Sequence, residues 1–140
     1  MKEKIKKEVP ARQSIQYICE RAENALVWLE ELEKDFQKRI KEKKDCCVIQ
    51  TQKRIIADII SVYISTLVDS RKNTNSLLTS YPKNDFVDKF KNLPIVKKCQ
   101  MSRHNRCAHE SKNYGFFVSP DEILKSNLKQ CLSEIQFFIS

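Results

Sequence analysis

The stretch SIQYICERAENALVWLEELEKDFQKRI, residues 14–40, decides the fold class. Apolar side chains recur in it every three or four residues, with Glu, Lys, Arg and Gln between them, which is the pattern of an amphipathic helix. Ser14 is a suitable N-cap residue, so we predict that the helix begins there. The apolar stripe consists of Ile15, Ile18, Ala22, Ala25 or Leu26, Leu29, Leu32, Phe36 and Ile40.

A second helix is predicted over residues 47–70. Its content of β-branched residues favours a strand, but the helical spacing and the length of the segment outweigh that preference. Its broad apolar face indicates the central helix of a bundle. Residues 71–84 follow as a turn region, because Asn, Ser, Thr and Pro cluster there.

Three shorter helices are predicted in the second half of the chain. One covers residues 85–92, capped by Asn84 or Asp85, and the next runs from Pro94, a residue favoured in the first turn, to Cys107. After a loop over residues 110–118, the sequence SPDE places Ser119 and Glu122 in a capping box with Pro120 between them. We expect one continuous helix from there to the C-terminus.

Composition excludes other fold classes. A length of 140 residues fits one domain, and a single Gly argues against all-β folds and against doubly wound folds with phosphate loops. We therefore predict an all-α, up-and-down bundle of four principal helices plus a short extra helix. The domain covers residues 11–140, preceded by a flexible basic N-terminus over residues 1–10.

The six cysteines are expected to be free thiols, most of them buried as small hydrophobic side chains. No apolar segment follows the basic start of the chain, and no apolar run approaches the roughly 20 residues of a membrane span. These observations predict a cytoplasmic protein without a membrane partner. The aromatic residues at helical spacing are expected in the core: Trp28, Phe36, Tyr63, Phe137 and Phe138.

The charge of the chain predicts an acidic partner. Lys and Arg number 26 against 18 Asp and Glu, which gives +8 and favours binding of nucleic acid, a nucleotide or an anionic surface. Half of this excess lies within residues 97–112, which also hold the only two histidines, His104 and His109. The basic residues of this window are Lys97, Lys98, Arg103, Arg106 and Lys112.

Imidazole and guanidinium groups together can cleave RNA without a metal. An imidazole exchanges protons near neutral pH, and a guanidinium binds phosphate oxygens and stabilises the phosphorane. Arg103 is predicted on the apolar face of its helix, where a charge is costly unless it is paired or lies in a cleft. A structural ion pair of Arg103, or a histidine that complements a helix dipole, is the alternative interpretation.

The sequence gives weaker support for two other kinds of site, a zinc site and a cysteine nucleophile. Cys99, Cys107 and the two histidines lie close in sequence, but no CxxC pair exists, and structural zinc sites normally use such tight pairs. Cys107 is two residues from His109, and side chains two apart on a helix do not face each other. We therefore predict neither a metal nor another cofactor, and no cysteine nucleophile.

The window from Arg103 to His109 resembles the signature of the HEPN family. That signature is an Arg, four to six residues and a His, usually with a polar residue after the Arg; here five residues intervene and His104 fills the polar position. HEPN domains are small helical bundles, and many are ribonuclease toxins or abortive-infection proteins. The resemblance covers about ten residues in detail and residues 15–138 loosely, as an order of helices.

The resemblance implies a metal-independent endoribonuclease that acts as a homodimer on RNA. His109 would be the general acid or base, Arg103 would bind the scissile phosphate, and His104 would orient or assist. Further phosphate contacts are expected from Arg106, Lys97, Lys98 and Lys112. Six helical steps place Arg103 and His109 about 120° apart around one helix, so a site shared across a two-fold axis suits them better than a site within one subunit.

The resemblance also bears on partners. A cognate antitoxin, of nucleotidyltransferase type or another, fits the family. Some HEPN toxins carry a Tyr two residues after the His, which such a partner modifies with AMP; Ser111 stands there in this chain, which puts that control in doubt. The alternative function is a non-catalytic HEPN module that binds RNA, a nucleotide or a protein.

Overall fold

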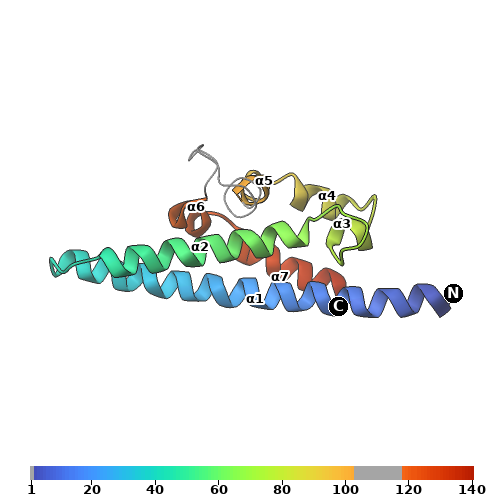
Figure 1. Ribbon diagram of the computed structural model, residues 1–140, viewed down its shortest axis with the longest axis horizontal. Coiled ribbons are helices and arrows are strands. Elements are labelled where there is room, and N and C mark those ends of the chain that lie inside the picture. Colours follow the sequence, from blue (N-terminus) through green and yellow to red (C-terminus); the bar gives the residue numbers. More distant parts are fainter. Residues whose placement is uncertain (1, 103–117) are drawn as a thin grey trace.

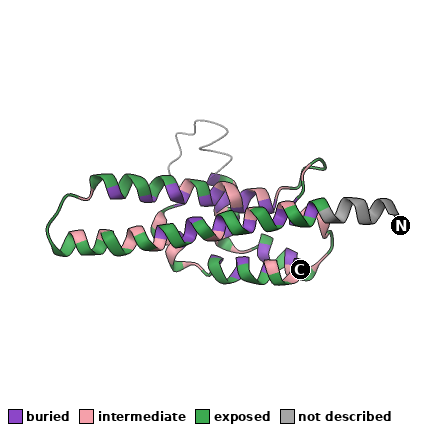
Figure 2. Ribbon diagram, turned by 90° about the horizontal axis from the view of Figure 1, so that it is seen from below, coloured by how far each residue is buried: buried purple, intermediate pink, exposed green. Residues whose placement is uncertain are grey.

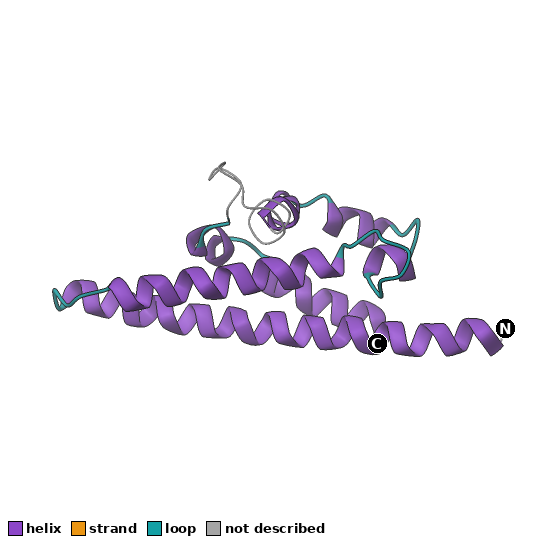
Figure 3. Ribbon diagram, viewed as in Figure 1, coloured by secondary structure: helices purple, strands orange, loops and turns teal. Residues whose placement is uncertain are grey.

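The computed structural model describes the backbone of residues 2–102 and 118–140 and the side chains of residues 10–102 and 118–140. These parts of the chain contain helices and no strand (Figure 3), which confirms the all-α prediction. The helices are α1 (Lys2–Lys41), α2 (Cys47–Leu67), α3 (Leu77–Ser80), α4 (Asp85–Lys91), α5 (Pro94–Ser102), α6 (Pro120–Lys125) and α7 (Leu128–Ile139).

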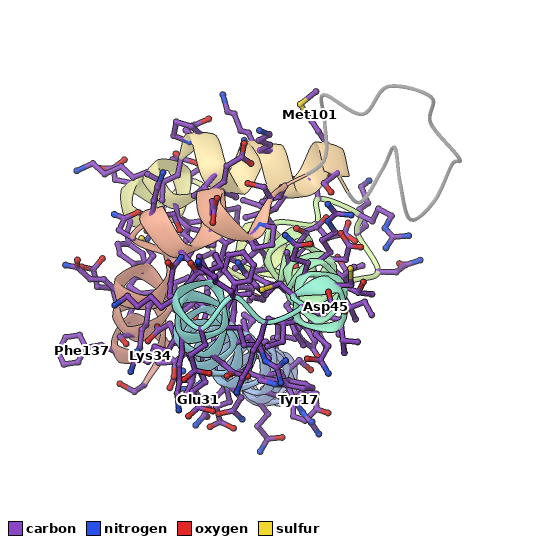
Figure 4. All side chains as sticks on the ribbon, turned by 90° about the vertical axis from the view of Figure 1, so that its left-hand side faces the viewer. Tyr17, Glu31, Lys34, Asp45, Met101 and Phe137 are labelled. Carbon is purple, nitrogen blue, oxygen red and sulfur yellow. The ribbon has the colours of Figure 1, made fainter. Side chains whose placement is uncertain are left out.

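Three helices run along the length of the molecule. Figure 1 shows α1 and α2 as a long antiparallel pair, with α7 beside α1 and antiparallel to it. Helices α5 and α6 are seen nearly end-on in that view and lengthwise in Figure 4, so they lie across the long helices. The up-and-down order therefore describes α1, α2 and α7, whereas α5 and α6 cover the bundle crosswise.

One hydrophobic core joins the long helices to α5 and α6. Figure 2 shows its buried residues along the middle of the molecule, whereas the end that holds the α1–α2 turn is mostly exposed. Burying such side chains is the main favourable term in folding, at roughly 1.5–3 kcal/mol for each fully buried Leu or Ile. Fully buried members include Ile15, Leu29, Ile60, Ile64, Ile123, Leu132 and Ile135.

The predicted start of the first helix at Ser14 is wrong. Helix α1 begins at Lys2 and continues through Pro10. A proline removes one backbone donor from a helix interior and usually ends or kinks it, which is why the sequence favoured a boundary there. Ser14 is not a cap: its Oγ accepts a hydrogen bond of 3.4 Å from Nδ2 of Asn75, which ties α1 to the segment before α3.

The described segments of the second half contain a helix that was not predicted, α3, and a break that was not predicted, between α6 and α7. Helix α3 lies inside the expected turn region, started by a capping box between Ser76 and Thr79. The last helix is interrupted between α6 and α7, where Ser126 is extended and its Oγ accepts from the amide of Leu128 at 3.4 Å. Ser and Asn prefer such cap positions, so the short sequence Ser126-Asn127 indicates the break between the two helices.

The cap predictions for the shorter helices are confirmed. Asn84 accepts from the amide of Val87 at 3.2 Å and starts α4. Ser119 and Glu122 form the predicted capping box of α6. Pro94 stands at the first position of α5. The predicted continuation of that helix to Cys107 lies outside the described residues.

Several residues predicted to be buried are exposed. Trp28 is 53 % exposed and Phe137 is 85 % exposed, so neither belongs to the core. Ile40, which belongs to the predicted apolar stripe of the first helix, is also about half exposed, and so is Ile55 on α2. Phe138 does pack inward, with its ring centroid 5.0 Å from that of Tyr81 and 5.1 Å from that of Phe86.

The cysteines of the described segments are free thiols. Cys19, Cys99 and Cys131 are buried, Cys46 is half-buried and Cys47 is exposed. The prediction that most cysteines act as small core residues thus holds for three of these five.

Among the described helices, none combines the length and the apolar character that crossing a membrane requires.

Candidate nucleic-acid interface

The structure describes the support of the predicted ribonuclease motif. The motif residues themselves lie outside the described residues: Arg103, His104, Arg106, His109 and Lys112. What is described is the helix that leads to them, α5, whose last residue is Ser102. Since Arg103 follows Ser102 directly in the chain, the packing of α5 determines where the motif begins.

Helix α5 is anchored on α2 by both apolar and polar contacts. Val96 and Cys99 are fully buried, as the predicted apolar stripe requires, and Ser102 is only 1 % exposed. Nε2 of Gln100 donates a hydrogen bond of 3.3 Å to the carbonyl oxygen of Val68, just after α2. The described end of α5 is therefore buried against α2 at Ser102, while Met101 beside it is exposed (Figure 4).

Cys99 has a structural role in this contact. Burial raises the pKa of its thiol to about 11, and a hydrogen bond with the side chain of Ser61 on α2 offsets only part of that shift. Ser61 in turn donates from Oγ to the carbonyl oxygen of Ala57 at 2.9 Å. A thiol with so high a pKa is neutral near pH 7, so Cys99 is neither a nucleophile nor a ready metal ligand.

The residues that are described hold no group of three metal-binding side chains. The zinc alternative also involved Cys107, His104 and His109, and these positions lie outside the described segments.

The two described phosphate-binding candidates differ in availability. Nζ of Lys98 forms an ion pair with Oε1 of Glu122, which links α5 to α6. Glu122 also accepts from the amide of Ser119 through Oε2, so its carboxylate is held in place by the capping box. Lys97 is exposed and forms no ion pair with any described residue. Of the two, Lys97 is therefore the one open to a phosphate.

A groove that the sequence did not reveal lies near the C-terminal end of α2. It has a volume of about 990 Å³ and is formed where the start of the described part of α1, the segment around α3 and the end of α7 meet. Three cations line it, Arg12, Lys72 and Lys83, together with the rings of Tyr81 and Phe138. These segments are far apart in sequence, so no local pattern could have indicated the groove.

Comparisons of the chain with protein-family models, with curated proteins and with solved structures returned no match. The similarity to the HEPN signature therefore stands on the residues from Arg103 to His109 alone.

Proposed function

We propose that this protein is a metal-independent endoribonuclease of the HEPN type, acting as a toxin or a phage-defence effector, with an active site shared across a homodimer. The observation that carries the proposal is the spacing of Arg103 and His109, with five residues between them, directly after the buried end of α5. An all-α domain and a net charge of +8 agree with a nuclease that binds RNA.

The anchored end of α5 supports the chemistry. Phosphoryl transfer depends on holding the reacting groups in place, and small displacements of these groups cost much of the rate. Ser102, the residue before Arg103 in the sequence, is buried, and Gln100 two residues earlier bonds to the carbonyl oxygen of Val68 just after α2, so the described end of α5 is anchored. In the proposed reaction, an imidazole takes the proton of the 2′-hydroxyl, the leaving 5′-oxygen gains a proton, and Arg103 stabilises the negative phosphorane.

Exposed apolar side chains on the long helices supply a surface for the proposed dimer. Tyr17 and Trp28 are 11 residues apart, about three helical turns, so they share one face of α1. Val48, Ile55 and Ile59 share a face of α2, and all five are exposed. Figure 4 labels Tyr17 and Phe137 on different sides of the molecule. A two-fold contact between copies would bury the same apolar side chains on both subunits.

The test is RNA cleavage by the purified protein in excess EDTA. Arg103→Ala and His109→Ala should each reduce cleavage by at least about 100-fold, since each removes a group that acts in the transition state. Lys34→Ala is the matched control, because Lys34 is an exposed cation on α1 that Figure 4 places on the side of the molecule opposite Met101. The control should retain full activity, and all variants should keep the circular dichroism of a helical protein.

The same variants test the shared site. Mixing inactive Arg103→Ala with inactive His109→Ala should restore part of the activity, because one of the two sites in a mixed dimer then has both groups. Equal cleavage by wild type and both variants would refute the assignment of the site. A folded protein that binds RNA without cutting it would favour the non-catalytic module instead.

A further inference from the structure

The groove at the α3 end of the molecule brings cations from three segments together. Its cations are Arg12 on α1, Lys72 in the segment before α3 and Lys83 in the segment after it. No Asp or Glu is among the described residues that line it. The three cations therefore approach one concave space from three separate segments, which concentrates positive potential there.

Within the described parts of the chain, Arg12, Lys72 and Lys83 form no ion pair and no side-chain hydrogen bond. The nearby Arg71 behaves differently, because its guanidinium is paired with Asp69 at 2.7 Å and its pKa is raised by that contact. Since no described residue pairs with these three cations, they are available to an anion, whereas the guanidinium of Arg71 stabilises the local turn.

One wall of the groove is aromatic. Tyr81 and Phe138 both line it, and their rings meet edge to face with centroids 5.0 Å apart. Phe86 supports Phe138 from behind, at 5.1 Å between ring centroids. Tyr81 is only half-buried, so its ring is held in position and still reaches the groove. A fixed aromatic ring beside cations is the arrangement that binds a nucleotide base next to its phosphates.

We propose that this groove binds a single strand of RNA, with phosphates at Arg12, Lys72 and Lys83 and a base stacked on Tyr81. The groove is open and polar, with three flexible cations, which suits a segment of a chain-like polyanion better than an enclosed small molecule. The choice of RNA as the strand rests on the proposed function. The groove itself does not, because its described lining residues include none from Arg103 to His109.

The experiment measures binding of a fluorescein-labelled oligouridylate of about ten nucleotides, with 2′-O-methyl groups that remove the attacking hydroxyl. Binding is thus read separately from cleavage, and a protein that fails to cut RNA can still pass this test. The triple variant Arg12→Gln, Lys72→Gln, Lys83→Gln should bind at least about tenfold more weakly at 0.1 M salt. Its slope of log affinity against log salt should fall by about 2, since each phosphate contact with a single strand contributes roughly 0.7.

The matched control is Lys34→Gln, Lys38→Gln, Lys41→Gln, which removes the same charge from exposed positions near the other end of α1. It should change the affinity by no more than about twofold. Equal weakening by both triple variants, or none by the first, would overturn the proposal.

Tyr81→Leu tests the stacked base and should weaken binding about tenfold with the salt slope unchanged. If Tyr81→Leu binds as tightly as wild type, the groove recognises negative charge alone, as an acidic peptide would also provide, and the assignment to RNA is overturned.

Discussion

The two halves of the α1–α2 pair have the same sequence pattern and are held together in different ways. In the half that packs against α7, the contacts between α1 and α2 are made by fully buried apolar side chains, among them Leu29 and Ile60. In the half that leads to the turn over residues 42–46, Ile40 is exposed and Val48 is 69 % exposed. Figures 1 and 2 show why: this end of the pair extends beyond α6 and α7, so no third helix of the described segments covers it.

Polar contacts replace apolar burial in that projecting half, which we call the tip (residues 33–53). Nζ of Lys53, on a side chain that is 8 % exposed, pairs with Glu33 and lies 4.0 Å from the ring centroid of Phe36. Nη1 of Arg39 donates to the carbonyl oxygen of Asp45 at 3.3 Å across the turn. The comparison teaches that helical periodicity predicts the helices equally well in both halves but does not predict what stabilises them.

The largest effect is expected from the packed half. Ile60→Ala should lower the free energy of unfolding by about 2–5 kcal/mol, because it removes a fully buried side chain and leaves a cavity where α2 meets the core. Urea denaturation followed by circular dichroism measures the change.

Ile55→Ala is the matched control, since it makes the same substitution on the same helix at a position that is 52 % exposed. It should change the free energy of unfolding by no more than about 0.5 kcal/mol. Similar losses for both variants would mean that Ile55 is covered in solution, for instance in the proposed dimer, and the contrast between the two faces of α2 would have to be revised.

The sequence predicted the features that depend on neighbouring residues. The helical period identified α1 and α2, and cap residues such as Asn84 and Ser119 identified the starts of α4 and α6. The exposure of Ile40 and Ile55 could not be predicted in the same way, because it depends on how far α7 reaches along the pair. The groove was missed for a related reason, since it is built from residues near positions 12, 81 and 138.

The second prediction concerns the ion pair of the tip. Lys53→Met should lower the free energy of unfolding by about 1–2 kcal/mol. This value lies between those for exposed and for buried ion pairs, because Lys53 is buried whereas Glu33 keeps a quarter of its side chain in solvent. Replacing both partners, with Glu33→Gln and Lys53→Met, should recover most of the loss. Lys44→Met is the control, because its pair with Glu42 is exposed and should contribute no more than about 1 kcal/mol.

This ion pair also makes the stability of the tip depend on pH. Burial alone would raise the pKa of Glu33, but hydrogen bonds from Lys53 and Gln37 and the charge of Lys53 lower it below its ordinary value of 4.5. The stabilisation is therefore complete above about pH 4.5 and is lost as the pH falls through the lowered pKa. The difference in stability between wild type and Lys53→Met should shrink over that range, and a difference that stays constant would contradict this role of Glu33.

The smallest effect is expected where α2 begins. Oδ1 of Asp45 accepts a hydrogen bond of 3.0 Å from the amide of Cys47, and this bond is the main reason that the pKa of Asp45 is lowered. Asp45→Ala should release the first turn of α2 and speed amide hydrogen exchange over residues 47–52 by roughly two- to tenfold.

The global free energy of unfolding should not change with Asp45→Ala, because the core lies well away from this turn. Asp45→Asn keeps an acceptor oxygen at the same position and should restore slow exchange. A drop in global stability would show that the tip unfolds together with the core, and the two halves would then be a single cooperative unit. If exchange changes only over residues 47–52, polar contacts at the tip act locally while apolar burial holds the rest of the molecule.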